Sequence, residues 1–160
     1  MKKTTTKYKG FTIIEVVLVL AIAGLIMLMV FIALPALQRS QKDTQRKNDM
    51  SRFISQIQQY QSNNRNKIPE KSEWETFKTN YLIVNGETFD DPDGTAYVLT
   101  EEDSLPNGGI LSAATFEANE HKLHIYRNAT CDGEKVVAST GSRKIAIQYK
   151  LESGVACNNN

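Results

Sequence analysis

The sequence predicts an α+β fold, in which one long N-terminal helix packs on a small antiparallel β-sheet. The first observation is an apolar run from Phe11 to Leu37 that continues into residues with helical spacing of apolar side chains. The second is a set of short C-terminal segments in which apolar and polar residues alternate, as they do in half-buried strands. We therefore expect a transmembrane half and an amphipathic half in the helix, followed by the sheet.

The apolar run is long enough to cross a membrane as a helix. Residues 16–34 carry no charge, and these 19 residues approach the roughly 20 that span a bilayer. A buried helix of a soluble domain is disfavoured, because the run is apolar on every face and the remaining chain is too small to enclose it. An ordinary secretory signal is disfavoured because the run exceeds a normal hydrophobic region and continues into a helix.

The residues around the start of the run carry the functional signal. The leader, residues 1–10, contains four lysines and no acidic residue. Within Phe11–Leu37, Glu15 is the single ionisable residue. A carboxylate inside an apolar span is costly and is usually paired, so Glu15 predicts a functional contact. A cut after Gly10 would create an amine at Phe11, which could pair with Glu15 of a neighbouring subunit.

The stretch Lys-Gly-Phe-Thr-Ile-Ile-Glu, residues 9–15, resembles the type IV prepilin signature. That signature is a short basic leader, a glycine, and Phe-Thr-x-x-Glu opening a long apolar helix. The resemblance implies that a prepilin peptidase cuts after Gly10 and N-methylates the new terminus at Phe11. It also implies that Glu15 guides the docking of subunits into a helical filament.

Two helix-weakening residues lie inside the run. Pro35 removes a backbone hydrogen bond, and Gly24 lacks a side chain that favours the helix. Filaments of the resembled family lose helicity in this stretch on assembly. Gly24 and Pro35 are therefore expected to bound a segment that melts, and the alternative is a simple kink in a continuous helix.

The resemblance also implies a location and a set of partners. The precursor is expected in the cytoplasmic (inner) membrane as a single span with its N-terminus inside, and the mature chain in an extracellular pilus on the cell surface. Counts of lysine and arginine on the two sides give no orientation, so the leader and the cysteines decide it. Expected partners are further copies of the chain, a prepilin peptidase, the pilus assembly platform and, before assembly, the lipid bilayer.

These observations divide the chain into three parts. Residues 1–10 are the cleaved leader, residues 11–37 the transmembrane and polymerisation helix, and residues 38–160 an extracellular globular domain. In that domain, residues 38–64 form the amphipathic half of the helix and residues 65–160 the loops and sheet. The stripe that faces the sheet is expected at Met50, Phe53, Ile54, Ile57 and Tyr60 or Gln61.

Shorter elements are expected after the long helix. Ser72 and Glu75 fit a capping box for a helix that reaches about Tyr81, with an aromatic face that packs on the domain. Strands are expected at residues 96–100, 121–127 and 144–151, and residues 101–119 are expected to form an exposed loop. In the last strand, the inward residues are Ile145, Ile147, Tyr149 and Leu151, and the outward residues are Ala146, Gln148 and Lys150.

The two cysteines, Cys131 and Cys157, are expected to form a disulfide. An even number of cysteines in a chain with an export signal favours this bond over two reduced thiols. The cysteine-bounded region also resembles the C-terminal region of type IV pilins, which is exposed on the filament.

An aspartate-rich turn is the one candidate metal site. Asp90, Asp91 and Asp93 could hold calcium through carboxylate oxygens, although the same residues are also good turn formers. The turn resembles the Asp-Pro-x-Gly-x-x-Tyr motif of major pseudopilins, some of which bind calcium. No cofactor is expected, and calcium at this turn stays an open alternative. His121 and His124 are expected to be exposed or packing residues.

The chain shows no sign of an enzyme, because it has no nucleophile beside a base, no phosphate loop and no metal-ligand set. The whole chain has a net charge of +1, and the four lysines of the leader contribute +4 of it. Residues 11–160 therefore carry a net charge of −3. DNA therefore stays uncertain as a partner. We expect a structural subunit of a type IV pilus for adhesion, twitching motility or DNA uptake. The alternatives are a type II secretion pseudopilin, which the cysteine pair disfavours, and a minor pilin specialised for DNA binding or adhesion.

Overall fold

The computed structural model describes residues 10–84, 86–111 and 121–160, so nine of the ten predicted leader residues lie outside the described part. By internal contacts the chain divides into two units, Met1–Gln38 and Arg39–Asn160, and each is described by itself. The elements, in order, are α1 (Ile13–Asn63), η1 (Lys71–Glu73), α2 (Trp74–Phe77), η2 (Lys78–Leu82), β1 (Val98–Glu101), η3 (Asn107–Gly109), β2 (Lys122–Arg127), β3 (Ala129–Asp132), β4 (Lys135–Ala138), β5 (Ile145–Lys150) and β6 (Val155–Asn159).

Helix α1 accounts for nearly a third of the chain. Pro35 lies inside it and does not end it. The helix stops at Asn63, because Arg65 and Asn66 adopt left-handed backbone angles, with φ of 55° and 61°. The Asn66 N–H then donates to the carbonyl oxygen of Gln61 at 2.7 Å and closes the last turn. The end lies one residue before the predicted one.

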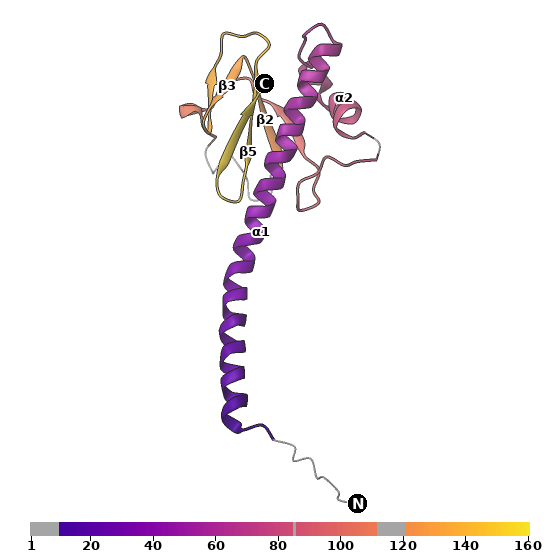
Figure 1. The fold of residues 1–160 in the computed structure, drawn as a ribbon. Coiled ribbons are helices and arrows are strands. Elements are labelled where there is room, and N and C mark those ends of the chain that lie inside the picture. Colours follow the sequence, from indigo (N-terminus) through magenta and orange to yellow (C-terminus); the bar gives the residue numbers. More distant parts are fainter. Residues whose placement is uncertain (1–9, 85, 112–120) are drawn as a thin grey trace, which may run out of the picture. The chain divides into compact units, whose positions relative to one another are not determined.

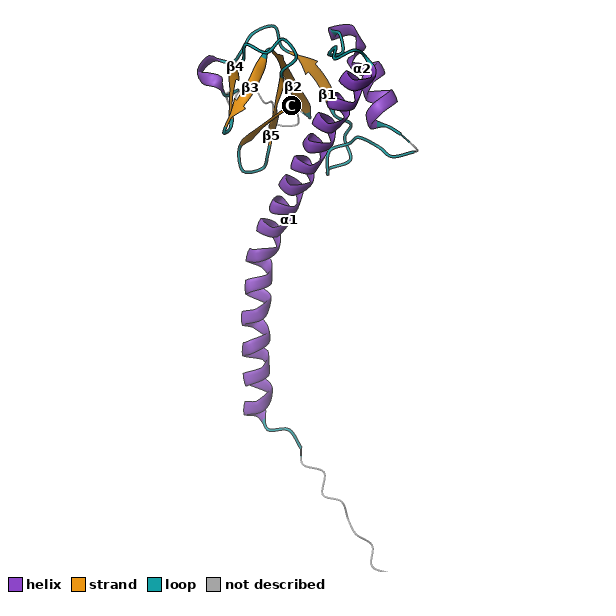
Figure 2. Cartoon of the chain, turned by 45° about the horizontal axis from the view of Figure 1, so that its top comes forward, coloured by secondary structure: helices purple, strands orange, loops and turns teal. Residues whose placement is uncertain are grey.

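The predicted apolar stripe of α1 is the centre of the second unit. Met50, Phe53 and Ile57 are completely buried. In Figures 1 and 2, this part of α1 lies between the sheet and α2. The ring of Phe53 lies 6.2 Å from the Trp74 ring and 5.7 Å from the Phe77 ring. The stripe is therefore confirmed, and it buries apolar surface on two sides.

The short helical segment after α1 begins earlier than predicted. The capping box at Ser72 and Glu75 is wrong, because Ser72 lies inside a 3₁₀ turn that starts after Glu70. The Glu73 carboxylate accepts the backbone N–H of Glu70 at 2.8 Å. The segment ends at Leu82 with a π-helical turn, and its aromatic face packs on the core as predicted.

The main sheet has four strands in the order β1-β2-β5-β6. Strand β2 pairs antiparallel with β5, and β5 pairs antiparallel with β6. Strand β1 runs parallel to β2, with Leu99 opposite Leu123, so the expected antiparallel sheet is in fact mixed. The reason is the long connection, residues 102–121, which lets the chain return to the same end of the sheet before β2.

A second, two-stranded sheet of β3 and β4 covers the face of the main sheet that lies away from α1 (Figure 2). Ala146 and Gln148 are therefore fully buried, and their prediction as outward residues is wrong. Ala146 packs with Tyr126 under the hairpin. The side-chain amide of Gln148 donates to the carbonyl oxygens of Gly109 and Glu134, both at 2.8 Å. Strands β3, β4 and β6 were not expected, because each is only four or five residues long.

The disulfide between Cys131 and Cys157 is present and joins the two sheets. Cys131 lies in β3 and Cys157 in the edge strand β6. The Asn159 side-chain carbonyl also accepts the backbone N–H of Cys131 at 3.2 Å. The bond therefore fastens the C-terminal strand to the hairpin.

Removing the disulfide should destabilise the second unit without changing its fold. The bond closes a loop with a sequence separation of 26 residues, and the chain-entropy model gives about 3–4 kcal/mol for that size. We expect the Cys131→Ser/Cys157→Ser variant of the full chain in detergent to unfold at a lower urea concentration than the oxidised protein. The reduced wild type is the matched control, and equal midpoints for the variant and the oxidised protein would contradict this stabilisation.

Candidate functional site

The predicted processing site lies just before α1. Gly10 and Phe11 precede the first helical residue, Ile13, and the Phe11 side chain is 89% exposed. The peptide bond between them is therefore free of helical hydrogen bonding, and exposed non-helical backbone is where proteolysis concentrates.

Glu15 closes the first turn of α1. Its carboxylate accepts the backbone N–H of Thr12 at 3.0 Å and the Thr12 hydroxyl at 2.9 Å. The Glu15 N–H donates to the Thr12 hydroxyl oxygen at 3.3 Å. This reciprocal pattern is a capping box, which satisfies orphan N–H groups at a helix start. The Thr-x-x-Glu spacing of Thr12 and Glu15 is the sequence signal for this cap.

The apolar run exposes an unbroken surface in the first unit. Large apolar side chains from Phe11 to Leu37 are all between about half and nine-tenths exposed. Among the described residues, α1 is the one helix long and apolar enough to cross a membrane. Gly24 and Pro35 both lie inside the continuous helix, so their role in melting stays a prediction.

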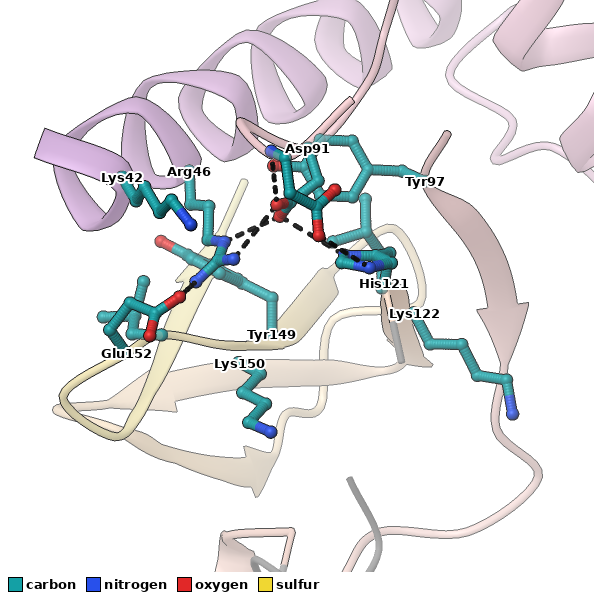
Figure 3. A pocket seen from close by; sticks show the side chains of 12 residues that line it. Lys42, Arg46, Asp91, Tyr97, His121, Lys122, Tyr149, Lys150 and Glu152 are labelled. Carbon is teal, nitrogen blue, oxygen red and sulfur yellow. Dashed lines mark hydrogen bonds and ion pairs between the residues drawn. The ribbon is translucent and has the colours of Figure 1, made fainter. Parts of the chain in front are cut away.

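A charged cluster in the second unit centres on Arg46 of α1. Its guanidinium donates to both carboxylate oxygens of Asp91, at 2.6 and 3.0 Å, and to Glu152 at 3.2 Å. Figure 3 shows this fork between Asp91 on one side and Glu152 on the other. The Asp91 side chain is 2% exposed and the Arg46 side chain 10%. The fork thus fixes α1 to the aspartate-rich turn and to the turn between β5 and β6.

Asp43, one helical turn before Arg46, makes a second attachment. Its carboxylate accepts the backbone N–H of Glu152 and the hydroxyl of Ser153, both at 2.7 Å. The sequence analysis missed Asp43 and Arg46, because the predicted stripe that faces the sheet began only at Met50. Their spacing of three, continued by Met50, was the available signal.

The electrostatics of the cluster follow from burial and hydrogen bonding. Burial opposes ionisation of Asp91, but the hydrogen bonds from Arg46 and from the Asp93 N–H outweigh it, so the pKa of Asp91 is lowered. The pKa of Arg46 is raised, and the hydrogen bond to Asp91 is the main cause. Burial raises the pKa of Asp49, and the Tyr97 hydroxyl donates to its carboxylate at 3.3 Å. Asp91 and Arg46 are therefore both charged at neutral pH.

The aspartate-rich turn meets a histidine that the sequence analysis set aside. His121 Nε2 lies 3.1 Å from a carboxylate oxygen of Asp93, and its Nδ1 lies 3.6 Å from Asp91. Within the described residues, Asp91, Asp93 and His121 form a group of three side chains whose oxygen and nitrogen atoms lie close enough together to hold a metal ion. Asp90 is not part of this group, and its backbone forms an isolated bridge with Ala96. Calcium on the three predicted aspartates stays a prediction.

The cluster lines a polar cavity of about 440 Å³. Three lysines lie around it, and Figure 3 shows the ammonium groups of Lys122 and Lys150 directed away from Asp91 and His121. Arg143 and Lys144 line a different cavity, which Asn160 also lines.

The Arg46–Asp91 pair should give the second unit an acid-sensitive stability. The pKa of Asp91 is lower in the folded chain than its ordinary value of about 4 in the unfolded chain. Ionised Asp91 therefore stabilises the fold at pH values above that ordinary pKa. This contribution is lost as the pH falls through the lower pKa of the folded state. We expect Asp91→Asn to lower the free energy of unfolding at pH 7 by about 3–5 kcal/mol and to flatten its decline between about pH 5 and pH 2. Urea titrations at a series of pH values measure both effects.

The exposed Asp132→Asn variant is the control for the removal of one carboxylate. It should keep the acid dependence of the wild type. If the acid limb of Asp91→Asn runs parallel to that of the wild type, Asp91 is not the group that carries the dependence.

Comparison with known protein families finds a match at the N-terminal segment that contains the predicted processing site. The family described as the prokaryotic N-terminal methylation motif matches residues 5–31. Searches of curated proteins and of solved structures gave no significant match. The matched residues include the Gly10–Phe11 bond, the Thr12–Glu15 capping box and most of the exposed apolar run. The chain therefore carries the N-terminal methylation motif, which is the signature of the type IV prepilins.

Proposed function

We propose that this chain is a structural subunit of a type IV pilus, cut after Gly10, N-methylated at Phe11 and assembled through α1 into a surface filament. The observation that carries the proposal is the exposed apolar surface of α1 with a single carboxylate at its start. A surface of this size cannot stay in water, because each buried Å² of apolar area is worth about 25 cal/mol. It needs lipid before assembly and neighbouring helices afterwards.

The capping box gives Glu15 a role at each stage. Before the cut, Thr12 supplies the hydrogen bonds that make the carboxylate tolerable at the start of the helix. After the cut, the amine of Phe11 in a neighbouring subunit becomes a charged partner of opposite sign. Since an unpaired charge in an apolar bundle is heavily penalised, this pair would fix the axial register of the filament.

The second unit suits the outer layer of such a filament. It is a folded domain with a largely polar surface, and the disulfide links its two sheets through β3 and β6. A disulfide persists in oxidising surroundings, which supports a location outside the cytoplasm. The proposal therefore places the apolar part of α1, up to Gln38, in the filament core and residues 39–160 on its surface.

A secretion pseudopilus is the nearest rival, because its subunits would share the same N-terminal segment. Deleting the gene should remove long surface fibres seen by electron microscopy and leave protein secretion intact. Mass spectrometry of fibres from the wild type should find a subunit that begins with N-methylated Phe11. Intact fibres together with failed secretion would assign the chain to the pseudopilus.

Replacing Glu15 separates its charge from its capping role. Gln at this position keeps a capping-box acceptor without the charge, whereas Ala removes both. We expect Glu15→Gln and Glu15→Ala both to insert into the membrane, as measured by fractionation, and both to lose at least ten-fold in fibre yield. Fibre yield of the wild-type level from Glu15→Gln would refute charge pairing and leave only the cap.

A further inference from the structure

We propose that Asp91, Asp93 and His121 form a binding site for a divalent transition metal ion, with Zn²⁺ as the best-suited ion. The site is independent of the filament proposal, because it lies entirely within the second unit. It also differs from the calcium alternative in its residues, since it uses an imidazole nitrogen and leaves out Asp90.

Three separate features of the chain bring the ligands together. Asp91 and Asp93 lie in the turn before β1, and His121 directly precedes β2. Strand β1 runs parallel to β2, with Val98 opposite Lys122, so the residues before the two strands meet at the same end of the sheet. The Arg46 fork and the Asp93 N–H hold the Asp91 carboxylate in place. The turn is therefore positioned independently of any ion.

The distances fit a metal after a small adjustment. One ligand atom from each residue lies within 4.8 Å of the other two. Tetrahedral zinc with ligands at about 2.0–2.2 Å needs ligand atoms roughly 3.3–3.6 Å apart. Rotation of the partly exposed Asp93 side chain can supply the difference, since this side chain is 36% exposed. Water would complete the coordination from the cavity.

The electrostatics favour a cation beside the imidazole. Each ring nitrogen of His121 faces a carboxylate, yet a neutral imidazole has only one N–H to donate. One carboxylate then faces a nitrogen lone pair, and this repulsion is relieved by a proton or by a metal ion. Arg46 does not neutralise the group, because Asp43 and Glu152 also share its charge.

The ligand chemistry decides which metal fits best. One imidazole nitrogen and two carboxylate oxygens suit zinc and related transition ions, whereas calcium takes six to eight oxygen ligands. An ion here would link the turn before β1, which is fixed to α1 by Arg46, to the start of β2. The expected consequence is stabilisation of the folded second unit by the bound metal.

The test uses the untagged full chain in detergent, stripped of metal with a chelator. Calorimetric titration with Zn²⁺ should show one ion per chain, bound more tightly than Ca²⁺, and zinc should raise the Tm. His121→Ala and Asp93→Asn should each lower the affinity for zinc by at least about ten-fold, because even the loss of a residue that only orients a metal ligand costs roughly ten- to a hundred-fold. X-ray absorption of the zinc complex should show one imidazole ligand.

Asp90→Asn is the matched control, because it removes a carboxylate next to Asp91 that is outside the group. It should bind zinc like the wild type. Neither the Asp93 side chain nor the His121 side chain takes part in the Arg46 fork, so both variants should fold. If His121→Ala fails to fold, Asp93→Asn still tests the site. Absence of one-to-one zinc binding, or unchanged binding by both ligand variants, would overturn the proposal. So would a preference for calcium that is lost in Asp90→Asn.

Discussion

The second unit depends on the burial of one stripe of α1. Met50, Phe53 and Ile57 are inaccessible to solvent because the sheet covers one side of the helix and the aromatic segment around α2 covers the other. A helix of this length gains most of its stability from such packing and little from intrinsic propensity. Both other layers are in turn held by α1, since the isolated four-stranded sheet and the short helices would leave their apolar faces in water. Loss of the stripe would therefore separate all three layers.

The polar continuation of that stripe fixes how the layers meet. Asp43 and Arg46 are buried on α1 at the positions before Met50, on the same face of the helix. Their hydrogen bonds reach the aspartate-rich turn and the β5–β6 turn. Buried ion pairs add little net stability, because desolvation offsets the attraction, but they penalise every arrangement that leaves a charge without its partner. The cluster thus favours one arrangement of the turns on α1, and this arrangement also places Asp91 beside His121.

The two parts of α1 form one continuous helix but differ in the surroundings that suit their side chains. From Phe11 to Leu37, apolar side chains cover every face of the helix and none of them is buried within the described chain, so this surface is suited to lipid or to other apolar helices. After Arg39, one face is buried and the other is polar, which is the pattern of a helix on a folded body. Glu15 places a charged group in the apolar part of the helix, and the capping box supplies its carboxylate with hydrogen bonds from Thr12. The same chain is therefore suited to a bilayer and to a helical bundle.

The sequence by itself determined the features that depend on local pattern and composition. These are the apolar span, the stripe from Met50 to Ile57, the disulfide and the N-terminal signature, because periodicity, length and cysteine count report them directly. Only the tertiary structure decided the parallel pairing of β1, the burial of Ala146 and Gln148, and the meeting of Arg46 with Asp91 and of Asp93 with His121. Each of these joins segments far apart in the chain, and alternation along one strand cannot reveal that a second hairpin covers its outer face. Polar residues such as Asp43 and Arg46 are assigned to the surface by composition, and only their distant partners show that they are buried.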